Sequence, residues 1–166
     1  GLQESRFTHR YQVLNTPGAK GPARGFWQFE KGGGCKGVVN HDASKYWMHG
    51  VCDDRGVPFT AEAIWLAIEN DDVLAASAAR LLLFTDGARL PAIDDLDGAW
   101  ACYIRNWRPG KPHRETWDAL YREAAHVIID SGKQGVRFLV QKLINKLISI
   151  DFNTIMQNNN KNSMQT

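Results

Sequence analysis

The sequence predicts a mainly α-helical fold of one domain, with at most a small β-hairpin near residues 26–40. The chain has 166 residues, of which 43% are hydrophobic, and this suffices for a single core. In several segments apolar residues recur at spacings of three and four, which indicates amphipathic helices. Alternating patterns typical of strands are few.

The first forty residues contain two segments that predict loops. Residues 15–24, NTPGAKGPAR, hold two prolines and two glycines, and residues 31–37, KGGGCKG, form a second flexible stretch. The aromatic block of residues 26–29, FWQF, lies between these loops. We interpret this block as the wall of a cleft rather than as part of a long helix.

Helices account for most of the remaining domain. A helix is expected to start near residue 58, where a proline, a threonine and a glutamate precede an apolar face. Residues 71–84 begin with two acids, which suit the positive end of a helix, and continue as an almost unbroken apolar surface, so they predict a buried central helix. Residues 94–107 show the same acidic start and end before RPGKP. Residues 114–129 predict a further helix.

The C-terminal part differs from the rest, and we place the domain boundary after residue 130. Five of the twenty Lys and Arg residues but one of the eighteen acids lie in residues 131–166. Residues 131–152 predict a basic amphipathic helix, which either contacts an anionic membrane or envelope weakly or is a poorly packed extension. The Asn-rich residues 153–166 predict disorder. This tail is an added segment or a frame-shifted end of the reading frame.

Composition also excludes several classes of protein. A net charge of +2 without a basic stripe in residues 1–130 argues against a nucleic-acid partner. No apolar run of about 18 residues predicts a membrane span, and no signal peptide is visible. The chain opens on Gly-Leu-Gln in what reads as the end of a helix, so we expect a truncated N-terminal helix. Three cysteines are too few and odd in number for a disulfide framework.

Two motifs near the start carry a resemblance to a known family. ESRF at residues 4–7, followed by GPARGFWQF at residues 21–29, resembles the leading motifs of soluble lytic transglycosylases in the lysozyme-like superfamily. In that family an acid-Ser-x-aromatic unit ends a helix, and a small-residue turn leads into Gly-apolar-apolar-Gln. The resemblance implies an α+β lysozyme-like domain in which Glu4 is the catalytic acid, Ser5 lies beside it and contacts the substrate, and Gln28 contacts the sugar.

The order of later segments agrees with the resemblance. Residues 71–84 resemble the family's central helix, and AWACYIRNWRPG resembles its third motif, with Tyr103 as the best match. The family usually has Asn directly after this Tyr, whereas this chain has Ile104. Asn106 substitutes for it only if the helix is irregular, because positions two apart point to different faces. The sequence segments GFWQFEKGGG and WRPGKPH resemble segments of uncharacterised tailed-phage proteins, which implies a phage origin.

The resemblance implies cleavage of peptidoglycan glycan strands at the bacterial cell wall, without a cofactor. Glu4 would donate a proton to the leaving oxygen and then accept one from the sugar's 6-hydroxyl, which closes a 1,6-anhydro ring. Tyr103 would orient the Glu4 carboxyl, and Phe26 and Trp27 would stack on sugar faces. Independently of the family, a proton donor of this kind needs apolar surroundings that raise the pKa of its carboxyl, and the aromatic block near Gln28 can provide them.

Two alternatives stay open. A hydrolytic muramidase on the same fold would need a second carboxylate, and Glu30 is the candidate. A phage structural or glycan-binding protein would keep the fold without activity. A metal site is not predicted, since the spacing of the Cys and His residues between residues 35 and 52 fits no paired-ligand pattern. These residues are Cys35, His41, His49 and Cys52.

Overall fold

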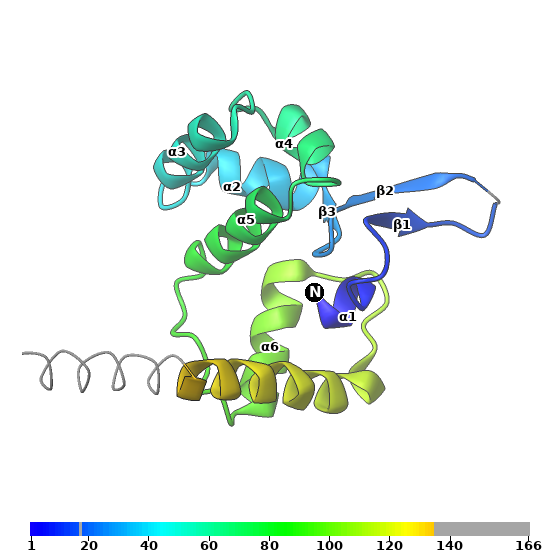
Figure 1. Cartoon of the computed structure of the whole chain (residues 1–166), viewed down its shortest axis with the longest axis vertical. Helices are drawn as coiled ribbons and strands as arrows, with labels where there is room; N and C mark the ends of the chain where they lie inside the picture. Colours follow the sequence, from blue (N-terminus) through cyan, green and yellow to red (C-terminus); the bar gives the residue numbers. More distant parts are fainter. Residues whose placement is uncertain (17, 135–166) are drawn as a thin grey trace, which may run out of the picture. The chain divides into compact units, whose positions relative to one another are not determined.

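The computed structural model describes residues 1–16 and 18–134 (Figure 1). The chain divides into two units, Gly1–Arg122 and Glu123–Thr166, and the second is described over residues 123–134, which are helical. The first unit is mainly helical and contains a small antiparallel sheet, so the predicted fold class is confirmed. The rest of the predicted tail helix and the predicted disordered end lie outside the described residues.

The small sheet has three strands in the order β1-β2-β3: β1 (Tyr11–Val13), β2 (Lys20–Arg24) and β3 (Phe29–Glu30). Only β3 falls within residues 26–40, where a hairpin was predicted, and the predicted loop over residues 15–24 is wrong where β2 runs. A proline is tolerated in β2 because β3 pairs only with the last two residues of β2, so Pro22 remains at an open edge on that side.

The glycine-rich segment after the sheet is helical, although its composition predicts a flexible loop. Residues Lys31–Cys35 form one turn of π-helix (η1), and α2 (Lys36–Asn40) continues from it. The fully buried side chains of Cys35 and Val38 anchor this segment in the core. Gly34 permits close packing, because a Cβ there would lie 3.0 Å from the ring of Phe29.

The short helix α1 (Leu2–Ser5) and four longer helices complete the labelled elements: α3 (Lys45–Arg55), α4 (Ala61–Ala67), α5 (Asp72–Phe84) and α6 (Leu96–Trp107). Thr60, Asp71 and Asp95 cap the last three, each accepting a hydrogen bond from a backbone N–H three residues on. The predicted starts of these helices are thus confirmed, whereas α3 was not predicted. A further helix covers residues 114–134 and includes the predicted segment.

The core is built around α5, as predicted for residues 71–84. Its inner face packs against α3, α2 and η1, and the buried residues of α5 are Leu74, Ala75, Ala78 and Ala79. Met48 of α3 and Ile64 of α4 are fully buried against this cluster, and each such side chain contributes roughly 1.5–3 kcal/mol.

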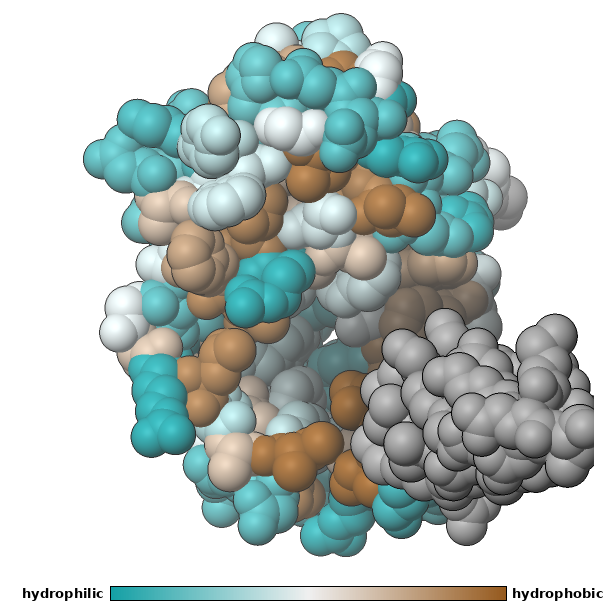
Figure 2. All heavy atoms as spheres, turned by 60° about the vertical axis from the view of Figure 1, so that its left-hand side comes forward, coloured by the Kyte–Doolittle hydropathy of each residue, from teal (hydrophilic) through white to brown (hydrophobic). Residues whose placement is uncertain are grey.

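The surface mixes residue types. On the face shown in Figure 2, hydrophobic residues form separate groups with hydrophilic residues between them. Among the described residues, the helices are too short or too polar to cross a membrane.

Candidate active site

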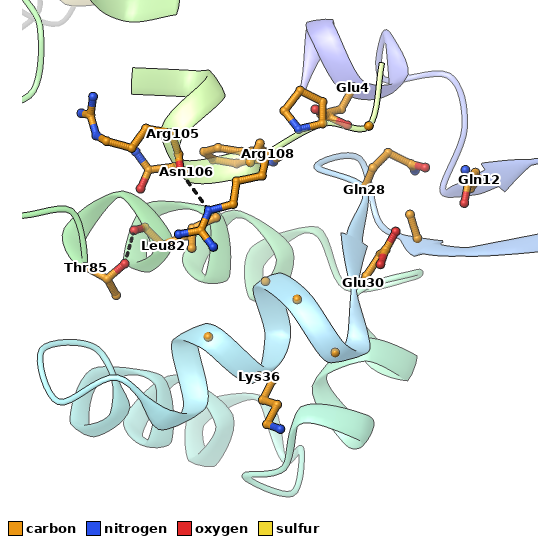
Figure 3. Close-up of a pocket in the computed structure, with 18 of the residues that line it drawn as sticks. Glu4, Gln12, Gln28, Glu30, Lys36, Leu82, Thr85, Arg105, Asn106 and Arg108 are labelled. Carbon is orange, nitrogen blue, oxygen red and sulfur yellow. Dashed lines mark hydrogen bonds between the residues drawn. The ribbon is translucent and has the colours of Figure 1, made fainter. Parts of the chain in front are cut away.

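A cleft of about 880 Å³ opens within the first unit, and three of the residues given a catalytic or binding role from the sequence line it. Glu4 comes from α1 (Leu2–Ser5), Gln28 from the turn between β2 and β3, and Glu30 from the end of β3 (Figure 3). The other walls include η1, α2, the C-terminal end of α5 and the segment from Arg105 to Lys111. The fold therefore brings together residues from the whole length of the first unit.

Glu4 is half-buried at the edge of this cleft. The Tyr103 hydroxyl donates a hydrogen bond of 2.6 Å to Oε1 of Glu4. Burial raises the pKa of the Glu4 carboxyl above its usual value, and the hydrogen bond from Tyr103 opposes part of that rise by stabilising the carboxylate. A carboxyl with a raised pKa that is also held in a fixed direction suits a general acid.

Tyr103 is itself held by aromatic packing. Its ring stacks on Trp107 and Trp117, with centroid distances of 6.2 Å and 5.1 Å, and it lies tilted against Trp100 at 5.4 Å. Burial raises the pKa of the Tyr103 phenol, and the neighbouring Glu4 carboxylate raises it further. The phenol therefore keeps its proton and remains a hydrogen-bond donor to Glu4.

Gln28 is placed by a tight turn that begins at Gly25. Gly25 has φ of 68°, and a Cβ there would lie 2.7 Å from the Ile68 carbonyl oxygen, so the turn requires glycine. The Gln28 side-chain amide donates to the Gly25 carbonyl at 2.8 Å. Its amide oxygen and second N–H remain for a ligand in the cleft.

Ser5 has a supporting position, which differs from its predicted contact with substrate. Its hydroxyl is buried, donates to the Phe26 carbonyl at 2.8 Å and accepts from the Phe7 amide at 3.2 Å. These bonds tie α1 to the turn that carries Gln28. Since Ser5 does not line the cleft, we assign it to positioning Glu4 rather than to binding sugar.

Phe26 and Trp27 do not line this cleft, so their stacking on sugar faces stays a prediction. Phe7 packs edge-on against both rings, at 5.4 Å and 5.9 Å. The Arg10 guanidinium covers Phe26 at 4.4 Å, and the Trp27 carbonyl accepts from Trp107 Nε1 at 3.1 Å. Both rings are half-buried and pack partly against neighbouring side chains.

Asn106 is a cleft residue that the sequence interpretation had set aside. The helix α6 is regular, yet Asn106 lines the cleft, because it lies three residues after Tyr103 and so shares a face with it. Its amide nitrogen donates to Asp86 Oδ2 at 2.8 Å and to the Cys102 carbonyl at 2.8 Å. Spacing measured from Tyr103, rather than from Ile104, would have indicated this position.

Asp86 fixes this end of α6. Besides Asn106, its Oδ2 accepts from Nε and Nη2 of Arg105, at 2.8 Å and 2.5 Å. The bonds from Arg105 and then Asn106 hold the pKa of the Asp86 carboxyl well below its usual range. With its nitrogen bound to Asp86, Asn106 has its amide oxygen left as an acceptor for a ligand.

Backbone strain concentrates near the cleft. Over the described ranges, four residues other than glycine have left-handed backbone angles. Gln28 and Arg108 line the cleft, and Arg6 and Phe7 directly follow the helix that carries Glu4. Such conformations are disfavoured for side chains with a Cβ and are often retained at functional sites.

The same described ranges contain no cluster of three or more His, Cys, Asp or Glu side chains able to hold a metal ion. Cys35 and Cys52 are buried in the core, and burial raises the pKa of the Cys35 thiol to about 12. A thiol in this state is a poor metal ligand and a poor nucleophile.

Comparison with known proteins gives one short match. No family model matches the chain, and no solved structure matches it. A shikimate kinase of Nitrosomonas europaea is 67% identical over 30 residues, which are 18% of this chain and 14% of the kinase. The chain thus covers far less than two thirds of that protein, and so short a match shows no family.

Proposed function

We propose that this protein is a lytic transglycosylase that cleaves the peptidoglycan strand between N-acetylmuramic acid and N-acetylglucosamine. The observation that supports this most is the sheltered Glu4 carboxyl, bonded to Tyr103 at the edge of a cleft that it shares with Gln28. Cleavage of a glycosidic bond needs an acid that holds its proton near neutral pH, and burial raises the pKa of the Glu4 carboxyl in that direction.

In the proposed reaction Glu4 acts twice. It first donates its proton to the oxygen of the leaving sugar as the glycosidic bond breaks. The resulting carboxylate, stabilised by the Tyr103 hydroxyl, then accepts the proton of the 6-hydroxyl, whose oxygen bonds to the anomeric carbon. The product is a 1,6-anhydro sugar, and no water is consumed.

Gln28 and Asn106 would position the sugar. Each uses a side-chain N–H within the protein and keeps its amide oxygen for a ligand. An N-acetyl group offers one N–H donor and one carbonyl acceptor, so amide side chains match it. Because partners within the protein fix both side chains, little ordering entropy is lost on binding.

A second candidate, a hydrolytic muramidase, is favoured by one observation: Glu30 lines the same cleft as Glu4. In Figure 3 both carboxylates, with Gln28 between them along the chain, lie at the same end of the cleft. In that reaction Glu30 would activate water or attack the sugar, and the product would carry a reducing end.

The test is mass spectrometry of purified sacculi after digestion with the wild-type protein and with Glu4→Gln. We expect anhydro-muropeptides from the wild type and a loss of rate of about 10²–10⁴-fold in Glu4→Gln. Glu62→Gln, an exposed acid on α4 away from the cleft, is the matched control and should keep full activity.

The other outcomes identify the alternatives. Hydrated products that disappear in Glu30→Gln would establish the muramidase. Absence of any released muropeptide, together with binding to sacculi that survives Glu4→Gln, would contradict both enzymes and leave a glycan-binding protein.

A further inference from the structure

Arg108 occupies an unusual position at the end of α6. It is the C-cap residue, with φ of 49° and ψ of 51°, and its backbone N–H donates to the Ile104 carbonyl at 3.1 Å. Glycine or asparagine is the common choice where a helix ends in this conformation, because a Cβ is disfavoured there. An arginine kept at such a place suggests a role for its side chain.

The side chain of Arg108 extends into the cleft (Figure 3). Its Nε donates to the Arg105 carbonyl at 3.3 Å, which leaves the N–H groups of the two terminal nitrogens. No carboxylate lies within ion-pair distance of Arg108 over residues 1–16 and 18–134, whereas the adjacent Arg105 is paired with Asp86. Arg108 is therefore a cation with a free guanidinium fork facing a cleft.

A second cation without an ion pair in the described ranges, Lys111, follows on the same loop and also lines the cleft. The cleft thus has an acidic end, with Glu4 and Glu30, and a basic segment after α6. A guanidinium fork binds planar anions through two parallel hydrogen bonds, and carboxylate has the matching geometry.

We propose that Arg108 binds a carboxylate carried by the glycan strand, and that this contact makes the cleft prefer acidic strands over neutral ones. The inference rests on the proposed function for the identity of the strand. The muramic sugar bears a lactyl ether whose carboxyl is free or joined to a peptide, and that peptide has carboxylates of its own. A polymer of N-acetylglucosamine carries none.

A purely structural role for Arg108 makes a different prediction. Its Nε caps a carbonyl near the negative end of the α6 dipole, which would stabilise the helix with no ligand present. In that case the replacement Arg108→Gly would change stability alone. It would leave the relative affinity for acidic and neutral strands unaltered.

The experiment measures affinity by isothermal titration in the full chain carrying Glu4→Gln, so that ligands are bound without turnover. Three ligands are compared: a peptide-bearing glycan tetrasaccharide, the same tetrasaccharide with its peptides removed, and the N-acetylglucosamine tetramer. Adding Arg108→Gly should weaken binding of the acidic ligands about 10- to 100-fold and leave the neutral tetramer unchanged. Added salt should reduce the difference.

Two further variants control for loss of folding and for a non-specific effect of removing a positive charge. Arg108→Asn also tolerates left-handed angles, so it should reproduce the effect of Arg108→Gly without unfolding the protein. Lys45→Gln is the charge control, because Lys45 is an exposed lysine on α3 that does not line the cleft. It should leave all three affinities unchanged.

Each outcome decides the matter. A loss confined to the peptide-bearing ligand assigns the carboxylate to the peptide. A loss confined to the peptide-free ligand assigns it to the lactyl group, whose carboxyl is free only there, and comparable losses for both show that Arg108 accepts either carboxylate. Equal affinities for acidic and neutral ligands, or equal losses for all three, would overturn the inference. If the wild type releases no muropeptide but the selective loss is seen, the proposed function fails while the anion site stands.

Discussion

The Tyr103 hydroxyl and the Glu4 carboxyl, 99 residues apart in the chain, form a hydrogen bond of 2.6 Å. This bond joins the short helix α1 to α6, and it is the contact that gives the Glu4 carboxyl its direction. Charged hydrogen bonds of this length are among the stronger ones in proteins. The bond also acts on the pKa of Glu4, where it opposes the effect of burial.

Replacing Tyr103 by Phe should therefore change both the rate and the pH profile of cleavage. Glu4 must be protonated to act as the acid, so activity falls as the pH rises through the pKa of Glu4. Loss of the Tyr103 donor removes a stabiliser of the carboxylate and raises that pKa further. We expect kcat to fall about 10-fold, because the carboxyl is no longer held in one orientation. The alkaline limb of the pH profile of kcat/KM should move to higher pH.

Tyr46→Phe is the matched control, because Tyr46 is an exposed tyrosine on α3 outside the cleft. It should leave the rate and the profile unchanged. An alkaline limb that stays in place or moves to lower pH in Tyr103→Phe would contradict the assigned role of the hydrogen bond.

Glu4 should also cost the protein stability at neutral pH. Its pKa is raised in the folded state, so folding favours the protonated form. The charged carboxylate is destabilising above the folded pKa, and the penalty disappears below the pKa of the unfolded chain. The neutral replacement Glu4→Gln should thus raise Tm by a few degrees at pH 7 and by nothing near pH 3. Thermal unfolding followed by circular dichroism at both pH values checks this, and a Tm gain that persists at pH 3 would point to another cause.

Ser5→Ala tests whether Ser5 positions the site. The change leaves the Phe26 carbonyl and the Phe7 amide without the hydroxyl that now bonds both. We expect a loss of about 1–3 kcal/mol in the free energy of unfolding, measured in urea, and a fall in kcat because α1 is less firmly held. Thr16→Ala, in an exposed loop, should change stability by less than about 0.5 kcal/mol. A stable but inactive Ser5→Ala would instead restore its predicted contact with substrate.

The sequence predicted those elements whose local signals and tertiary packing agree. Asp71 and Asp95 cap helices where acidic starts predicted them, and the inner face of residues 71–84 is buried, in line with their largely apolar surface. The glycine-rich segment was predicted wrongly as a loop. Its helical form depends on contacts of Cys35 and Val38 with distant parts of the core, which no local pattern shows.

The site was predicted only in part, because some of it depends on backbone geometry and contacts that no local sequence pattern shows. Motif order indicated Glu4, Gln28 and Tyr103 as one constellation, and the structure brings Glu4 into contact with Tyr103 and into one cleft with Gln28. The supporting role of Ser5 and the position of Arg108 depend on backbone geometry. Left-handed angles at non-glycine residues are not readable from composition, so sequence analysis did not single out Arg108.

Gly25 and Gly18 provide a comparison that separates backbone strain from steric contact. Both have left-handed angles, with φ of 68° and 75°. A Cβ at Gly18 would meet nothing within 4 Å, whereas one at Gly25 would lie 2.7 Å from the Ile68 carbonyl oxygen. Gly18→Ala should thus cost about 1–2 kcal/mol from the left-handed backbone alone.

Gly25→Ala should cost a further 1–3 kcal/mol, roughly the penalty for overpacking, because a backbone oxygen cannot move aside as a flexible side chain can. The turn that carries Gln28 must then shift, so kcat/KM should fall in Gly25→Ala and stay unchanged in Gly18→Ala. Urea unfolding and muropeptide release measured on the same samples check both effects. Equal stability losses in the two variants would show that the turn relaxes freely around Ile68, and the tight placement of Gln28 would then not depend on Gly25.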